Sequence, residues 1–134
     1  MGHDEHFKGD VDVDGHLWVE GSLNFGRTGV TQQTSTSTAV TINTSAGIIT
    51  SFPPTASIGV GTAIATIPVN NARVKAGSTV LVTIESGTLG ATVTNIPYAL
   101  VSGIVANQFT ITVYNIGSTA TNSVAPVKVG FLVM

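Results

Sequence analysis

The chain contains no cysteine and carries very little charge. Only 9% of its 134 residues are Asp, Glu, Lys or Arg, whereas an ordinary soluble domain carries about 25%. The absence of cysteine excludes disulfides, thiolate metal sites and cysteine nucleophiles. Because so few charged residues are available, they cannot cover the whole surface with solvated charged side chains. We therefore expect much of it to be covered by other chains.

Basic residues and long apolar runs are also scarce. The formal net charge is −2, and binding to nucleic acid or to anionic lipid requires clustered Lys and Arg. No apolar run approaches the roughly 18 residues of a membrane-spanning helix, and the first residues lack the basic and then apolar plan of a signal peptide. We expect a protein made in the cytoplasm, without a cofactor, and with neither nucleic acid nor a membrane among its partners.

Thr, Val and Ser are abundant, with 20, 18 and 11 residues, and β-branched residues favour strands over helices. Apolar and polar positions alternate between turns rich in Gly, Pro and Asn. This pattern predicts eight short strands, at 30–33, 39–43, 47–52, 62–69, 79–85, 98–105, 109–115 and 127–133. Strands at this spacing without helical periodicity predict an all-β fold, as a β-sandwich, a jelly roll or a small barrel.

Alternation within the strands predicts which residues form the core. In a strand with one buried face, every second side chain points inward. The predicted core residues are Val80, Val82, Ile84, Phe109, Ile111, Val113, Val129 and Phe131. The opposite faces carry Thr, Ser, Leu and Tyr instead of Lys and Glu, and uncharged edges invite pairing with other chains. The low charge therefore predicts obligate assembly.

Charge is distributed unevenly along the chain. Six of the seven acids, all three histidines and the only Trp lie in the first 20 residues, whereas the sequence from Thr28 onward has one acid, Glu85, and three bases. This shift in composition divides the chain into an N-terminal arm, residues 1–28, and a β body, residues 29–134.

The arm contains a six-residue repeat, in which VDVDGH, LWVEGS and LNFGRT follow one another from Val11 and place Gly15 and Gly21 six residues apart. Each unit predicts a short strand with one apolar face, followed by a glycine turn. A single hairpin with Asp14 and Gly15 as its turn fits the same residues. Neither arrangement buries its apolar side chains alone, so we expect the arm to mediate attachment and oligomerisation, intertwined in a trimer. The residues assigned to this role are Val11, Val13, Leu17, Trp18, Val19, Leu23 and Phe25.

Three segments of the body carry a resemblance to known proteins. They are TAVTINTSAGIIT at 38–50, STVLVTIESGT at 78–88 and VANQFTITVYNIG at 105–117. With them, residues 29–134 resemble the small C-terminal β-domain of virion structural proteins of tailed bacteriophages and prophages. The resemblance implies a β-sandwich-like structural domain in a virion particle, usually trimeric and without enzymatic activity. It also implies that Phe109, Ile111 and Val113 supply core residues.

These features together predict a structural virion protein. We expect a trimeric capsid decoration (cement) or head-fibre protein on the exterior of the capsid, whose arm binds the major capsid protein or another virion protein. The alternative is an adhesion module of a tail fibre or spike that binds a host glycan or protein. The short arm favours the first, and Tyr98, Tyr114 and Phe52 are too far apart in sequence to predict the clustered aromatics of a glycan site.

Two motifs could indicate metal binding, and both have plainer interpretations. Asp10, Asp12 and Asp14 with Gly15 match the first half of a calcium loop, but Gly21 occupies the position of the required bidentate acid. A solvated acidic strand face is therefore the preferred interpretation. The pair formed by His3 and His6 has the spacing of a zinc or nickel site, but a histidine-rich terminus is usually disordered. We predict no metal site.

The body lacks the residues that catalysis requires. From Thr28 to the end there is no His, Asp or Cys and a single Glu, whereas acid–base and nucleophilic catalysis need His, paired carboxylates or an activated nucleophile. We predict that the protein is not an enzyme. Glu85 is interpreted as a surface charge partnered by Arg73 or Lys75.

Overall fold

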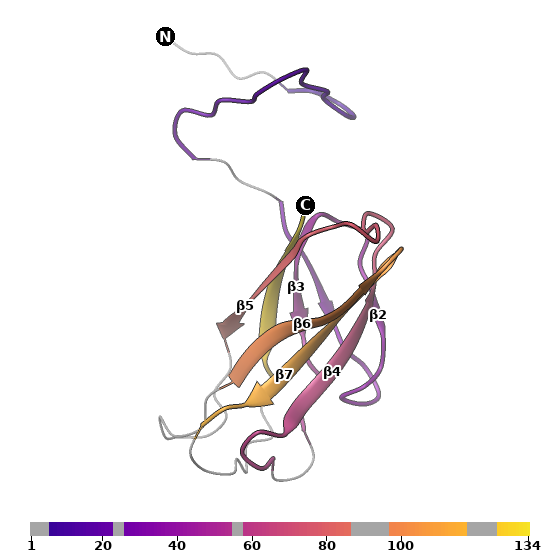
Figure 1. Ribbon diagram of the computed structural model, residues 1–134, viewed down its shortest axis with the longest axis vertical. Helices are drawn as coiled ribbons and strands as arrows, with labels where there is room; N and C mark the ends of the chain where they lie inside the picture. The colour runs from indigo at the N-terminus through magenta and orange to yellow at the C-terminus, as the bar shows by residue number, and fades with distance from the viewer. Residues whose placement is uncertain (1–5, 23–25, 55–57, 87–96, 118–125) are drawn as a thin grey trace.

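A computed structural model describes residues 6–22, 26–54, 58–86, 97–117 and 126–134 (Figure 1). These residues form an all-β structure with eight strands and no helix. The strands are β1 (Thr28–Thr31), β2 (Val40–Thr41), β3 (Ala46–Thr50), β4 (Ala63–Asn70), β5 (Val80–Ser86), β6 (Pro97–Val105), β7 (Gln108–Asn115) and β8 (Lys128–Val133). No helix able to cross a membrane is therefore found in the described part of the chain.

The strands form two mixed sheets of four. Sheet A has the order β1-β3-β8-β5, and sheet B has the order β2-β4-β7-β6. In each sheet the first pair, β1 with β3 and β2 with β4, is parallel and the remaining pairs are antiparallel. Figure 1 shows sheet B in front of sheet A. All eight strands overlap the strands predicted from the alternation pattern, and their ends agree within two residues.

The two sheets share one hydrophobic core. Phe109 of sheet B and Phe131 of sheet A meet in it, with ring centroids 5.3 Å apart and planes tilted by 57°. Six of the residues predicted to be in the core are buried there: Val80, Phe109, Ile111, Val113, Val129 and Phe131. Val82 and Ile84, on edge strand β5, are half-buried and pack against the same core. An edge strand has a neighbour on one side only, which accounts for their partial exposure.

Gly47 makes room for the aromatic pair. It lies opposite Phe131 in the β3–β8 ladder, and a Cβ atom at this position would lie 2.6 Å from Phe131 Cε1 and 2.7 Å from Ile42 Cδ1. Both distances are shorter than a van der Waals contact. The absence of a side chain at Gly47 is therefore what allows the Phe131 ring to pack closely against β3.

Buried amides connect the loops to one another. Gln32 donates from Nε2 to the Thr38 carbonyl at 2.8 Å, and its Oε1 accepts the Phe52 N–H at 3.0 Å. Asn71 donates to the Thr44 carbonyl at 2.8 Å, and its Oδ1 accepts the Arg73 N–H at 2.9 Å. A buried amide is stabilising only when its polar atoms are paired, and both amides meet this condition.

Candidate attachment and assembly surfaces

Residues 6–22 of the arm contain no strand. The hairpin predicted around Asp14 and Gly15 is therefore not formed in these residues. A two-stranded hairpin without a covering layer is at best marginally stable in water, and no other part of the described chain buries the arm. The alternative arrangement, a stack of short strands built from the six-residue repeat, requires further copies of the chain to bury its apolar face. It stays a prediction.

Three glycines divide the arm into equal units. Gly9, Gly15 and Gly21 have φ values of +96°, +109° and +101°, a region that side-chain-bearing residues rarely adopt. They are six residues apart, and Gly9 extends the repeat by one unit ahead of those recognised in the sequence. The sequence pattern and the backbone conformation therefore share the same period.

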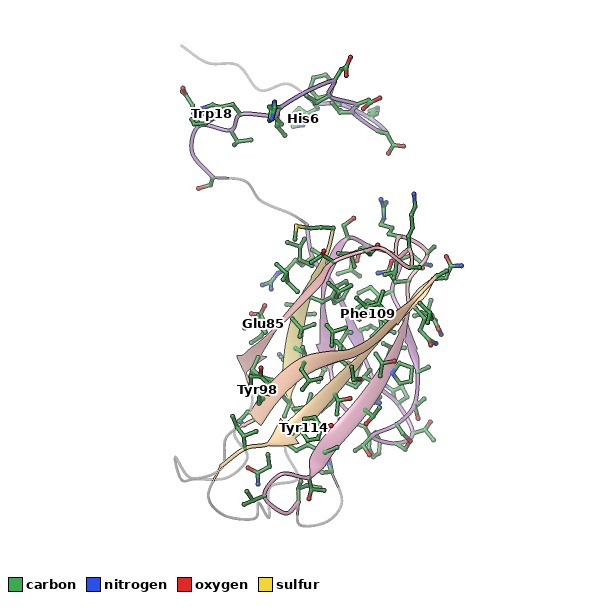
Figure 2. All side chains as sticks on the ribbon, in the orientation of Figure 1. His6, Trp18, Glu85, Tyr98, Phe109 and Tyr114 are labelled. Carbon is green, nitrogen blue, oxygen red and sulfur yellow. The ribbon has the colours of Figure 1, made fainter. Side chains whose placement is uncertain are left out.

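The apolar side chains of the arm are open to solvent. Their exposed fractions are 85% for Trp18, 66% for Leu17, 58% for Val11, 45% for Val13 and 40% for Val19. Figure 2 shows Trp18 and His6 well away from the two sheets. The other two residues assigned to attachment, Leu23 and Phe25, lie outside the described residues. An exposed aromatic next to aliphatic side chains is a typical interface anchor.

An ion pair joins the base of the arm to the body. Arg27, which directly precedes β1, donates from Nη1 to Glu85 Oε1 on β5. The expected partners of Glu85, Arg73 and Lys75, are therefore wrong: Arg73 donates from Nε to the Asn43 carbonyl at 3.1 Å instead. β1 and β5 are the two edge strands of sheet A, so this ion pair spans the outer face of the sheet. The two residues are 58 positions apart in the sequence, which is why the pair could not be predicted from sequence.

A hollow lies beside this ion pair on the outer face of sheet A. Gly130 points outward there, since its neighbours Val129 and Phe131 point into the core. The hollow has a volume of about 390 Å³, and we define it by Gly130 and six of the other residues that line it: Arg27, Ala46, Leu81, Thr83, Glu85 and Leu132. A Cβ at Gly130 would lie 2.9 Å from Glu85 Cδ, so the glycine leaves space for the Glu85 side chain.

The outer face of sheet B has a different character. Its strands β2, β4, β6 and β7 contain no charged residue. Tyr98 and Tyr114 are direct cross-strand partners on this face, and Figure 2 shows both at the same end of the sheet. The expectation that these aromatics are separated is therefore wrong for this pair, because the β6–β7 register brings together residues that are distant in sequence. Ser102 and Thr112 add a hydroxyl pair at 2.8 Å between the same two strands.

The acidic and histidine motifs of the arm do not converge in the described residues. Asp10, Asp12 and Asp14 are exposed, and within the described part of the chain no three His, Cys, Asp or Glu side chains gather where they could hold a metal ion. His3 lies outside the described residues, and His6 is exposed. The candidate surfaces of the described residues therefore offer apolar contact area and one ion pair for binding a partner.

Comparison with known proteins gives no match to this chain among protein-family models, curated proteins or solved structures.

Proposed function

We propose that this chain is a non-enzymatic structural protein of a tailed-bacteriophage virion, a trimeric capsid decoration or head-fibre protein that binds the capsid shell through its N-terminal arm. The resemblance of residues 29–134 to C-terminal domains of virion proteins supports the virion assignment. The attachment role rests on one observation: Trp18 and Leu17 of the arm are exposed to solvent in the single chain. Exposing apolar side chains to water is unfavourable in free energy, and burying them against a partner surface removes this cost.

The body supports a structural role in this proposal. Two sheets that share one core are what a β-sandwich or jelly-roll-like domain requires, and short strands with few charges suit packing among identical copies. Glu85 is the only carboxylate side chain of the body and is occupied by Arg27. This inventory supports a role in binding and assembly without catalysis.

A second candidate function is adhesion to a host surface through the outer face of sheet B. The specific observation that favours it is the Tyr98–Tyr114 pair on a face without charges. Aromatic rings beside hydroxyl groups suit a neutral glycan, because sugar rings stack on aromatic faces and hydroxyls supply hydrogen bonds. In this case the protein would belong to a tail fibre or spike.

Sedimentation separates the two candidates. Purified protein is incubated with undecorated capsids and, separately, with host cells. We expect it to sediment with capsids and the Trp18→Ala variant to remain in solution, whereas Tyr98→Ala serves as the matched aromatic control and sediments normally. Sedimentation with cells but not with capsids, lost in Tyr98→Ala and kept in Trp18→Ala, would establish the second candidate and reject the first.

The trimer has its own test. Mass measurement in solution should give three chains of 13.7 kDa each. A solitary chain at every concentration would contradict the proposed assembly, because the arm would then remain uncovered.

A further inference from the structure

The hollow on sheet A has the size and the chemistry of a side-chain receptor. Its volume is about 390 Å³, near the lower end of the roughly 300–1,000 Å³ of typical ligand sites, so it fits one large side chain with its neighbours. Leu81 and Leu132 give it an apolar wall, and Leu81 is 52% exposed. A half-exposed leucine beside a concave surface is apolar area that a partner would cover.

The charges of the chain favour a partner segment that is acidic. Residues 1–26 contain six acids and one lysine, a net charge of −5, whereas residues 27–134 contain four bases and one acid, a net charge of +3. Arg27 lines the hollow together with its ion-pair partner Glu85, so these two charges offset each other. Lys128 lies on the same face of β8 as Gly130, because alternate residues of a strand share a face. Opposite charges on two surfaces direct their association and fix its orientation.

The arm has the complementary features. Trp18 is its most exposed apolar residue, Leu17 and Val19 flank it, and acids precede and follow this group. The hollow is apolar, with the Arg27–Glu85 pair in its lining and Lys128 as a further base on the same face, and the arm is apolar with acids at its margin. Trp is also the residue type most enriched among interface anchors that fill pockets.

The arm of the same chain does not occupy the hollow. All described arm residues are exposed, and Figure 2 places Trp18 beyond the end of the sheets, far from Glu85. Arg27, paired with Glu85, lies at the margin of the hollow near the C-terminal end of the arm, whereas residues 6–22 lie away from the two sheets (Figure 1). A segment with the same acidic and apolar residues is available from another copy of the chain, whose arm could occupy the hollow.

We infer that the arm of one copy binds the hollow of a neighbouring copy, with Trp18 as the anchor. The inference rests on the proposed role of the arm in assembly. It assigns Trp18 to the contact between copies, so contact with the capsid shell falls to other exposed apolar residues of the arm, such as Val11 and Val13, and Trp18→Ala weakens capsid binding by breaking up the trimer. Each copy then gives one arm and receives one. Such head-to-tail contacts form a closed ring when the rotation between copies closes, which is compatible with a trimer.

Engineered cysteines test the contact in the full chain, which has no native cysteine. His16→Cys places a thiol on the arm near Trp18, and Thr83→Cys places one in the hollow with little change in side-chain size. Equal amounts of the two single variants are mixed and oxidised, and disulfide-linked dimers are identified by mass. Val105→Cys is the matched control, since Val105 is 57% exposed and belongs to sheet B.

We expect the mixture of His16→Cys and Thr83→Cys to give the mixed dimer as the main product, and the mixture with Val105→Cys to give little. Adding Trp18→Ala to the His16→Cys chain should weaken the contact about 30-fold, as expected for loss of a central aromatic anchor. If His16→Cys links only to itself, or links to Val105→Cys as readily as to Thr83→Cys, the inference is wrong.

The double variant with both cysteines in one chain tests the alternative occupant. An internal disulfide that forms at every dilution would show that a chain binds its own arm, and would overturn the second-copy assignment. Capsid sedimentation remains a separate readout. Mixed dimers without capsid binding would reject the proposed attachment to the shell and leave this inference standing, whereas capsid binding without mixed dimers would reject the inference alone.

Discussion

The arm and the body use the same alternation of apolar and polar residues, but only the body converts it into strands. In the body, Phe109, Ile111 and Val113 are at most 1% exposed, because the facing sheet covers them. In the arm, Val11, Val13 and the residues around Trp18 follow the same period and remain in water. The comparison teaches that alternation specifies which face of a strand is apolar, and that a strand forms only where a second surface is available to bury that face.

The largest difference between the two regions should appear when each loses an aromatic side chain. Phe109→Ala should lower the free energy of unfolding by about 3–5 kcal/mol, because it empties a site in the core and removes the contact with Phe131. Trp18→Ala should change it by less than about 0.5 kcal/mol in dilute solution, since exposed positions contribute little. Denaturant unfolding followed by circular dichroism measures both. Equal losses would mean that the arm is part of the folded core.

A smaller effect is expected from filling the space at Gly47. Gly47→Ala should lower the free energy of unfolding by about 1–3 kcal/mol, because the new methyl group overlaps the Phe131 ring and Ile42. Gly77→Ala is the matched control, since Gly77 is exposed and no atom lies within 4 Å of the position of its Cβ. Thermal unfolding of both variants tests this. If the two melt alike, the packing between Gly47 and Phe131 is looser than the distances indicate.

The ion pair between Arg27 and Glu85 is where the two regions meet, and its expected contribution is smaller still. The side chains are 43% and 29% exposed, and exposed pairs typically contribute about 0–1 kcal/mol. Arg27→Gln should therefore cost at most about 1 kcal/mol, and the loss should shrink in high salt because salt screens exposed charges. Unfolding at two salt concentrations, combined with Glu85→Gln and the double variant, isolates the coupling. A salt-independent loss would mean that Arg27 acts by packing.

The positions of the strands could be predicted from the sequence because alternation and turn residues are local signals. Much of the core followed for the same reason, since Phe131 and Val129 alternate within one strand. The partners of these elements could not be predicted. The arm showed the same alternation without a neighbour to pair with, and the two tyrosines of sheet B are brought together only by the β6–β7 register.

The candidate surfaces were predictable only in part. The exposed apolar residues of the arm followed from their position in a repeat that cannot bury itself. The hollow could not be predicted from the sequence. It depends on the position of Gly130 on β8, between β3 and β5, and on the ion pair between Arg27 and Glu85, which are 58 residues apart. Buried Gln32 and Asn71 were also missed, since a polar residue beside a turn is normally expected to face water.

The smallest effect on folding is expected at the glycines of the arm, where the effect on assembly should be clear. Gly15→Ala should leave the free energy of unfolding of the body within about 0.5 kcal/mol, because Gly15 is exposed and no atom lies within 4 Å of the position of its Cβ. The φ of +109° at this position is unfavourable for Ala by about 1–3 kcal/mol, so the turn between two units shifts and association should weaken about 5- to 150-fold. Gly26→Ala is the control, since Gly26 also has open space around it and its φ is not positive. Sedimentation equilibrium of the two variants compares them, and equal association would show that the period of six in the arm has no role in assembly.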